Sequence, residues 1–236
     1  MTPVLKTTSE MPLLVIAGFG EGLGLSLARR FVAGGFRVAG IARNGPSQPA
    51  PEVRLYRADL ADPVAAADAM RAIESDFGSP AVLVHNAAAL VRGPFLELQA
   101  ADFEQAWRSN VLTAFNSCRA AIPGMLRRGG GALILSGATA SLRGGGRFAP
   151  FASSKFALRG LAQSLAREFQ GQGLHVAHVV LDGILWSARS RARFPDLQAE
   201  GCLDPDAVAE TYWQLAHQPP SAWTLELDLR PQTESF

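Results

Sequence analysis

A cluster of glycines directly after a short apolar run is the feature that most constrains the fold of this chain. Residues 13–17 are all apolar, glycine follows at positions 18, 20, 22 and 24, and an amphipathic segment comes next. A strand, a glycine turn and a helix in this order favour a loop that binds dinucleotide phosphates over a helix that merely follows a flexible loop. Gly18 permits the tight turn, Gly20 and Gly22 let backbone approach a pyrophosphate, and Gly24 lets the helix pack closely. The predicted phosphate-binding residues are Gly18, Phe19, Gly20, Gly22, Leu23 and Gly24.

Apolar strand candidates alternate with amphipathic helix candidates along the rest of the chain. Asp62-Pro63 and Asp204-Pro205 each combine an N-cap residue with proline at the first helical position, which predicts two helix starts. Long helices are expected over residues 102–128 and 150–170. The predicted strands are residues 13–17, 36–42, 53–56, 81–84, 132–135, 176–181 and 223–229. This alternation predicts an α/β Rossmann fold, a doubly wound parallel seven-stranded sheet with helices on both faces.

The chain is expected to form a single dinucleotide-binding domain over residues 1–236, with an N-terminal tail at 1–11 and a C-terminal tail at 230–236. A hydrophobic content of 48% is enough for a substantial core, and no repeat or linker divides the sequence. The net charge of +1 and the lack of a membrane-length apolar run argue against nucleic-acid and membrane partners. Cys118 and Cys202 match no metal or redox spacing, so we expect no metal site and a cytoplasmic location with reduced thiols.

The end of the second predicted strand indicates which dinucleotide is bound. NAD-binding folds place a carboxylate about 20 residues after the glycine loop, where it holds the ribose 2′-hydroxyl. This chain has no Asp or Glu between Glu21 and Glu52, and the strand ends in Ala42-Arg43-Asn44. The Arg43 guanidinium suits the 2′-phosphate of NADP, although a surface arginine is the simpler alternative. The missing acid and the present base together predict NADP(H) in preference to NAD(H), with Arg43 and Asn44 as contacts.

Two more predicted strand ends carry candidate cofactor contacts. Asp59-Leu60 follows the third strand, where Asp59 is either an acceptor for the adenine amino group or a turn residue. Asn86-Ala87 follows the fourth strand, and Asn86 either lines the cofactor ribose or stabilises the sheet. Because ligands of such sheets lie beyond the carboxyl ends of the strands, these positions are expected to converge on one crevice.

In these motifs the sequence resembles the short-chain dehydrogenase/reductase family over nearly its whole length. The carrying residues are the glycine motif at 17–24, Asp59-Leu60, Asn86-Ala87-Ala88, Asn110, the segment 151–155 and Asp182-Gly183-Ile184. The resemblance implies the fold, hydride transfer with a nicotinamide cofactor, and further cofactor contacts from Lys155, Gly183 and Ile184. It identifies the chain as an atypical member, because Phe151 stands where the family has its catalytic tyrosine.

What the resemblance implies for catalysis is therefore only partly present. In the family, the tyrosine is the general acid/base, the lysine four residues later lowers its pKa, and a serine polarises the substrate oxygen. Phe151 and Lys155 keep a spacing that puts both on one helix face, but a phenyl ring cannot transfer a proton. The serine position falls on Ala138, and Ser141 is the hydroxyl favoured to replace it, with a loop residue as the equal alternative. The predicted catalytic residues are Lys155, Asn110, Ser141 and Phe151.

Lys155 is the one residue of this motif with a transferable proton, and desolvation lowers the pKa of a lysine. Asn110, which matches the family's proton-relay asparagine, would connect it to bulk water. Reduction of an already activated imine or conjugated alkene, which needs little proton assistance, is a second route. The proton donor is therefore expected to be non-standard.

Residues 184–203 are expected to form the substrate lid, by resemblance to the family. The segment is apolar and basic, and further arginines follow the fifth strand. These features predict a small-molecule substrate that is anionic or aromatic, against the simpler interpretation of a solvated face. The arginines concerned are Arg143, Arg147, Arg189, Arg191 and Arg193.

The helices predicted at 102–128 and 150–170 resemble the pair through which family members commonly dimerise, so a homodimer or homotetramer is expected. Their surplus apolar residues are Trp107, Phe115, Phe156 and Phe169. Three functions stay open from sequence. The first is an NADP(H)-dependent oxidoreductase acting on a small carbonyl, imine or activated alkene. The second is a catalytically impaired NADP(H)-binding regulatory module, and the third is a non-redox lyase or isomerase on the same fold.

Overall fold

A parallel sheet in the order β3-β2-β1-β4-β5-β6-β7 forms the centre of the computed structural model, which describes residues 11–44 and 50–234. Most of the expected N-terminal tail, the turn-rich connection around Ser47 and the last two residues of the C-terminal tail lie outside the described residues. The strands are β1 (Leu13–Ala17), β2 (Arg37–Ala42), β3 (Val53–Arg57), β4 (Val82–His85), β5 (Gly131–Ser136), β6 (Leu174–Leu181) and β7 (Glu226–Leu229). All six strand pairs within the described part are parallel, so the predicted single Rossmann-type sheet is confirmed.

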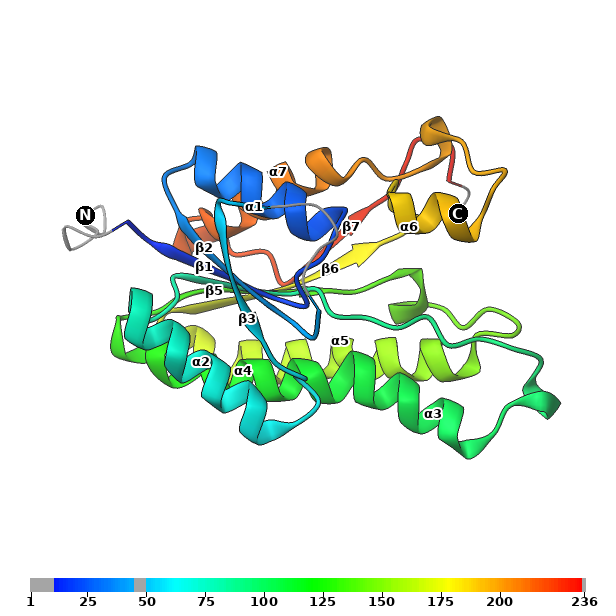
Figure 1. Ribbon diagram of the computed structural model, residues 1–236, viewed down its shortest axis with the longest axis horizontal. Helices are drawn as coiled ribbons and strands as arrows, with labels where there is room; N and C mark the ends of the chain where they lie inside the picture. The colour runs from blue at the N-terminus through cyan, green and yellow to red at the C-terminus, as the bar shows by residue number, and fades with distance from the viewer. Residues whose placement is uncertain (1–10, 45–49, 235–236) are drawn as a thin grey trace.

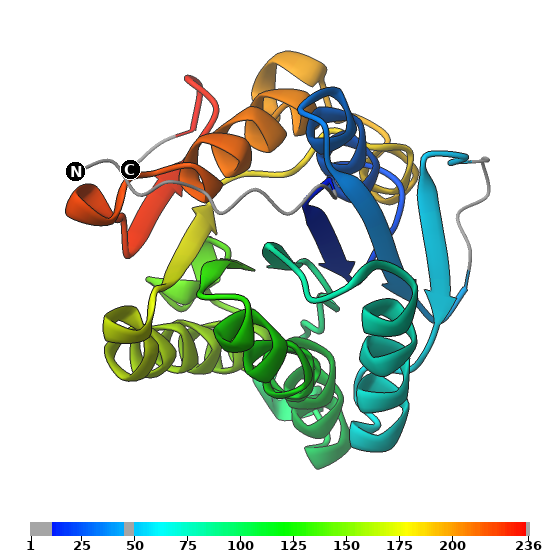
Figure 2. The same cartoon turned by 90° about the vertical axis from the view of Figure 1, so that its left-hand side faces the viewer.

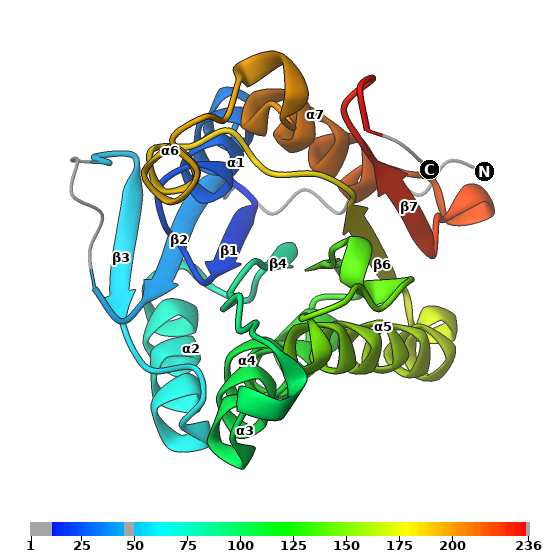
Figure 3. The same cartoon turned by 90° about the vertical axis from the view of Figure 1, so that its right-hand side faces the viewer.

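Helices cover both faces of the sheet (Figures 1, 2 and 3). The α-helices are α1 (Leu23–Ala33), α2 (Pro63–Phe77), α3 (Ala100–Trp107), α4 (Thr113–Arg127), α5 (Ala149–Phe169), α6 (Ala188–Arg193) and α7 (Pro205–Ala216). Helices α2, α4 and α5 lie on one face, and α1 and α7 lie on the other. Each face therefore has its own apolar core.

The sequence of β1 shows why two cores form. Leu13, Val15 and Ala17 pack towards α2 and α4, whereas Leu14 and Ile16 pack towards α1 and α7. Side chains of a strand alternate between the two faces, and a parallel sheet covered on both faces reads as a continuous apolar run. All four residues of β4 are likewise buried.

The predicted helix starts are confirmed. The Asp62 carboxylate accepts a hydrogen bond from the Val64 N–H at 2.8 Å, and Pro63 is the first residue of α2. The Asp204 carboxylate accepts from the Asp206 N–H at 3.0 Å before α7. An aspartate N-cap satisfies N–H groups that the first helical turn leaves without partners, and proline lacks the N–H that would need one.

Most elements begin or end within two residues of their predicted bounds, and two differ in a way that has a structural cause. The helical stretch expected at 102–128 begins at Ala100 and contains a π-helical turn, η2 (Arg108–Leu112), between α3 and α4. The last strand was expected from Trp223, but a 3-10 turn over Pro220–Ala222 delays β7 until Glu226. Proline restricts the backbone before the strand, a local effect that the alternating pattern of residues 223–229 hides.

The order of the strands fixes where a ligand can bind. β1 lies between β2 and β4, so the chain leaves β1 in one direction and later returns on its other side. Ligands of open α/β sheets bind outside the carboxyl ends of the strands at such a switch point. In Figure 1 the lid helix α6 and the long loops after β4 and β5 lie at this end. No helix in the described part of the chain is long and apolar enough to span a membrane.

Candidate active site

The glycine turn is fastened to the neighbouring strands. The N–H groups of Gly18 and Phe19 both donate to the carbonyl of Ile41 in β2, each at 2.9 Å. Gly18 has φ +86°, and a Cβ there would lie 2.4 Å from the backbone nitrogen of Ala87 after β4. In contrast, within the described residues nothing beyond its chain neighbours lies within 4 Å of where a Cβ of Gly20 would be. The turn is therefore tight against the sheet at Gly18 and open at Gly20, where a phosphate can approach the backbone.

The start of α1 completes this phosphate cradle. Gly22, with φ +83°, is the N-cap, and no side chain caps the helix. Uncapped N–H groups and the positive end of the helix dipole attract phosphate. Gly24 packs against the ring of Phe19, 3.5 Å from where a Cβ would lie, and not against the strand as expected. The Phe19 ring also packs on Gly40 of β2, so it wedges the turn between α1 and the sheet.

A cavity of about 450 Å³ extends from this turn along the carboxyl ends of the strands. Nine of the predicted cofactor contacts line it: Gly18, Phe19, Gly20, Arg43, Asn44, Asp59, Leu60, Asn86 and Ala87. The predicted contacts Gly22, Leu23, Gly24, Lys155, Gly183 and Ile184 are not among its lining residues. The structure thus brings the phosphate, ribose and adenine candidates together, and leaves Lys155 outside this cavity.

The charges around this cavity are mainly basic. Arg43 and Asn44 are exposed at the end of β2. The Asp59 carboxylate accepts from the Ala61 N–H at 3.0 Å and forms an ion pair with Arg108 at 3.6 Å. Arg189 reaches the same cavity from α6. Some lining residues come from α3, η2, α4 and α6, and their position depends on tertiary packing and has no local signal. Sequence reasoning missed these as cavity residues: Gln105, Arg108, Ser109, Thr113 and Arg189.

Lys155 is buried at the end of β5. Its ammonium group donates to the carbonyl of Ser136 at 2.9 Å, and burial lowers its pKa to about 8. The Nζ atom lies 5.8 Å from the centroid of the Phe151 ring, so both side chains share one face of α5, as their spacing predicts. A lysine with this pKa exists in both protonation states near neutral pH, as a proton donor requires.

Asn110 lies in the π-helical turn η2 and is fully buried. Its side-chain oxygen accepts from the Ala89 N–H at 3.0 Å, and its nitrogen donates to the Ala89 carbonyl at 3.1 Å and to Ser154 Oγ at 2.9 Å. Ser154 Oγ in turn donates to the carbonyl of Phe151 at 2.8 Å. Asn110 therefore joins the loop after β4 to the helix that carries Phe151 and Lys155.

The candidate hydroxyls after β5 already have partners. Ser141 is fully buried, and its Oγ accepts from the Ala138 N–H at 3.1 Å. Thr139 is more exposed and donates to Asp182 Oδ1 at 2.5 Å. Asp182 is buried and forms ion pairs with Arg143 at 3.8 Å and with Arg230 at 3.2 Å. The assignment of Ser141 to substrate polarisation stays a prediction. Asp182 opens the Asp182-Gly183-Ile184 motif, to which the sequence assigned contacts only through Gly183 and Ile184.

Two buried histidines, His85 and His178, lie near Lys155. His85 of β4, Leu135 of β5 and His178 of β6 are in register across the sheet. Burial lowers the pKa of His85 to about 3, and burial also lowers the pKa of His178, whose Nδ1 lies 3.0 Å from Glu226. Both imidazoles are therefore neutral at pH 7, and neither adds a second charge beside the ammonium group.

The two ends of the predicted lid, residues 184–203, lie side by side. Leu185 and Leu203 form a parallel bridge, and the N–H of Trp186 donates to the carbonyl of Leu203 at 2.9 Å. Between them α6 begins at the Ser187 N-cap, whose Cβ lies 3.2 Å from where a Cβ of Gly22 would be. The lid segment is thus seated over the glycine turn.

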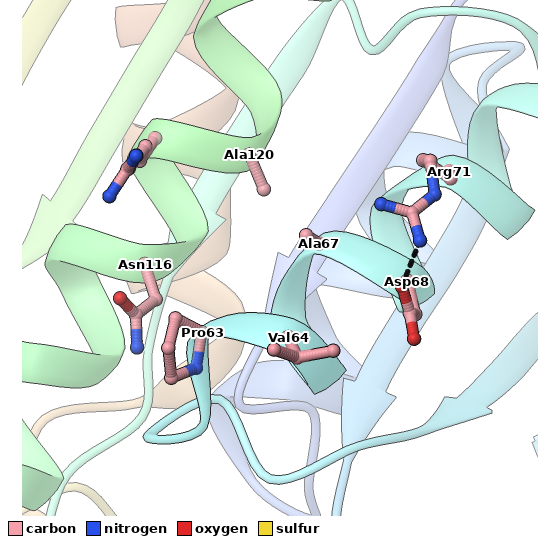
Figure 4. A pocket seen from close by; sticks show the side chains of 8 residues that line it. Pro63, Val64, Ala67, Asp68, Arg71, Asn116 and Ala120 are labelled. Atoms are coloured by element: carbon pink, nitrogen blue, oxygen red, sulfur yellow. Dashed lines mark hydrogen bonds and ion pairs between the residues drawn. The ribbon is translucent and has the colours of Figure 1, made fainter.

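A second cavity of about 350 Å³ lies between α2 and α4 (Figure 4). Apolar side chains such as Val64 and Ala120 line it, together with Asn116 and the ion pair of Asp68 with Arg71. Its lining residue Asn116 donates to the carbonyl of Leu60 at 2.9 Å, and none of the predicted catalytic residues lines it. In the described residues, no group of three or more His, Cys, Asp or Glu side chains is arranged to hold a metal ion.

The chain is similar to known dehydrogenases and reductases. The 3-oxoacyl-[acyl-carrier-protein] reductase MabA of Mycobacterium tuberculosis is 30% identical over 179 residues, which cover 76% of this chain and 71% of MabA. A short-chain dehydrogenase from Rhodopseudomonas palustris is 34% identical, with a TM-score of 0.80 and coverage of 93% of this chain and 98% of that one. The fold also matches a Tyr-to-Phe variant of ElxO with NADPH bound, with a TM-score of 0.82, 21% identity and coverage of 92% and 97%.

The family described as short chain dehydrogenase matches residues 13–196. This match spans the strands from β1 to β6, the glycine turn, Asn110, Phe151 and Lys155. The chain therefore belongs to the short-chain dehydrogenase/reductase family.

Proposed function

We propose that this protein is an NADP(H)-dependent oxidoreductase that acts on a small carbonyl, imine or activated alkene without a tyrosine as proton donor. When bound, the nicotinamide cofactor supplies or accepts the hydride. The observation that carries the proposal is the cavity that joins the open glycine turn to Arg43 and Asn44. Relatives of the same family are reductases and dehydrogenases, which supports redox chemistry.

The cofactor preference is proposed from charge. Arg43 and Asn44 directly follow β2, where an NAD-binding chain would place a carboxylate. Of the two acidic residues that line the cavity, Asp59 is paired with Arg108, and Glu21 belongs to the glycine turn. A guanidinium at this edge can form two parallel hydrogen bonds with the 2′-phosphate of NADP(H). The 2′-hydroxyl of NAD(H) has a single oxygen and no charge, so it cannot form this pair.

Lys155 is proposed as the proton donor. Its lowered pKa and its place beside Phe151 support this role, and Asn110 fixes the backbone around them. In this structure the ammonium group is directed at the Ser136 carbonyl, so donation requires it to exchange that partner for the substrate oxygen. Reduction by this route is expected to decline above pH 8, because the folded-state lysine loses its proton there.

The test is a parallel titration of the purified protein with NADPH and NADH, followed by nicotinamide fluorescence. We expect NADPH to bind at least about tenfold more tightly, and Arg43→Leu to remove that difference while leaving NADH binding unchanged, since a charge-assisted bidentate contact contributes about 1.5–3 kcal/mol. Arg29→Leu, at an exposed position of α1, is the matched control. Equal binding of both cofactors would disprove the NADP(H) preference, and binding of neither would disprove the proposal.

A second candidate, a catalytically impaired NADP(H)-binding module, is favoured by the satisfied hydroxyls and by the phenyl ring at residue 151. Phe151→Tyr separates the two candidates. If the pocket is built for redox work, the variant should gain NADPH-dependent carbonyl reduction over the wild type, because the phenol would lie beside Lys155. An unchanged, negligible rate with intact NADPH binding would favour the regulatory module.

We also propose a homodimer or homotetramer. Trp107, Phe115 and Phe156 are 47%, 44% and 43% exposed on α3, α4 and α5, whereas Phe169 packs against the core. Phe156→Glu should dissociate the assembly in sedimentation analysis, because it places a charge in an apolar contact. A wild-type protein that sediments as a monomer would disprove this assembly. Cytoplasmic localisation stays a prediction.

A further inference from the structure

Arg92 lies where three segments of the substrate side meet. It follows β4 in the loop after Ala89, and its guanidinium carbon lies 5.4 Å from the ring centroid of Phe148 and 5.8 Å from that of Phe194. Phe148 is the N-cap residue of α5, and Phe194 ends α6 in the lid. One cation therefore lies within cation–π range of two aromatic rings, one from the predicted lid and one at the start of the helix that carries Lys155.

The hydrogen-bonding edge of this guanidinium is not used by the described part of the protein. Among the described residues, Arg92 makes ring contacts and no hydrogen bond or ion pair with a carboxylate. The acidic residues nearest to these segments in sequence, Glu97 and Asp196, do not pair with it. The guanidinium carbon of Arg193 lies 5.9 Å from the ring centroid of Phe194. Arg193 therefore adds a second positive charge beside this ring. Stacking uses the faces of a guanidinium and leaves its N–H groups directed outwards in the plane.

The backbone holds this cluster in place. The N–H of Gly93 donates to the carbonyl of Arg147 at 2.9 Å, which joins the loop after β4 to the loop before α5. Arg147 has φ +70°, a left-handed conformation that a residue other than glycine seldom adopts. Such a conformation persists where the surrounding contacts enforce it, and it clusters at ligand-binding sites.

The position of the cluster relative to Lys155 follows from helix geometry. The Ala152 N–H donates to the Phe148 carbonyl at 2.7 Å. Phe148 therefore lies one helical turn before Ala152, the residue that follows Phe151. Seven residues separate Phe148 from Lys155, which corresponds to about 10 Å along the axis of α5. A group held by Arg92 would thus lie several bonds away from a carbon that reacts beside Lys155.

We propose that Arg92 is the substrate-anchoring residue and binds a carboxylate, so that the substrate is an oxo, imino or unsaturated acid whose carboxylate is separated from the reacting carbon by several bonds. The substrate class rests on the oxidoreductase proposed above. The planar guanidinium binds both carboxylate oxygens, while Phe148 and Phe194 contact the apolar part of the molecule. A 2-oxo acid, whose carboxylate is adjacent to the carbonyl, does not fit this spacing.

The test compares 4-carboxybenzaldehyde with its neutral methyl ester. Calorimetric binding to the protein saturated with NADP+, which cannot reduce the aldehyde, gives a ratio of dissociation constants that does not require turnover. We expect the acid to bind at least about tenfold more tightly than the ester. Arg92→Leu should bring the ratio to about one, Arg92→Lys should keep part of it because charge remains without the bidentate fork, and Arg29→Leu should leave it unchanged.

Because Arg92 is exposed, its substitution is expected to preserve the fold, and thermal unfolding of each variant checks this. Equal binding of acid and ester by the wild type, or a preference that survives in Arg92→Leu, would overturn the proposal. If turnover occurs, Arg92→Leu should raise KM for the acid at least about tenfold with kcat changed little. An acid preference that depends on Arg92 without NADPH consumption would support the anchor and contradict the proposed oxidoreductase instead.

Discussion

The half of the molecule around β1 and β2 differs from the half around β5 and β6 in what its polar groups do. At the glycine turn, α1 starts without a side-chain cap and Gly20 faces open space. At the end of β5, Ser141 and Lys155 are both buried and hydrogen-bonded within the protein. In the first half, backbone N–H groups are left available for a ligand. In the second half, the polar side chains are hydrogen-bonded to groups of the protein itself. Substitutions on the open side of the glycine turn should accordingly affect binding, whereas substitutions of closely packed or hydrogen-bonded groups should affect stability.

The largest effect is expected at the point where the glycine turn touches the sheet. Gly18→Ala should lower the free energy of unfolding by more than about 4 kcal/mol, because its Cβ would overlap the backbone of Ala87 at a positive φ. Gly20→Ala is the matched control and should leave stability unchanged while weakening NADPH binding, since its Cβ would enter open space. Urea unfolding and NADPH titration measure both. Equal stability losses would show that the turn is not divided in this way.

The next effect depends on pH. The pKa of Lys155 is about 8 when folded and 10.5 when unfolded, so the unfolded chain binds more protons between these values and stability rises with pH there. Relative to Lys155→Met, the wild type should gain roughly 2.5 kcal/mol between pH 7 and pH 10. Titration of Cys118, whose pKa burial raises, is common to both proteins and cancels. Unfolding curves that shift in parallel with pH would contradict the buried, titrating lysine.

The smallest effect compares two asparagines. Asn110→Ala should cost about 2 kcal/mol, because the variant leaves the N–H and carbonyl of half-buried Ala89 and the hydroxyl of buried Ser154 without this partner. Asn44→Ala, at the exposed end of β2, should change stability by less than about 0.5 kcal/mol. The same urea series measures both, and similar costs at the two positions would erase the contrast between the halves.

The features that sequence predicted are those with a local cause. The glycine turn, the Asp-Pro helix starts and the parallel sheet follow from neighbouring residues and from periodicity, and the structure confirms them. The π-helical turn at Asn110 was not predicted, because it depends on the contact of Asn110 with Ala89 and Ser154, which are distant in sequence. The place of Arg189 in the cavity likewise depends on how the lid folds back. The roles assigned to Ser141 and Lys155 stay predictions, since hydrogen-bond partners decide which groups are free.

The bridge between Leu185 and Leu203 makes residues 186–202 an exchangeable unit. Because the chain enters and leaves this segment at one point, a change in its length does not displace β6 or α7, and closing a longer loop costs little additional entropy. Descendants of this chain could therefore acquire a different lid while the glycine turn and the sheet stay as they are. Transplanting residues 186–202 from a relative with another substrate is the corresponding route for engineering.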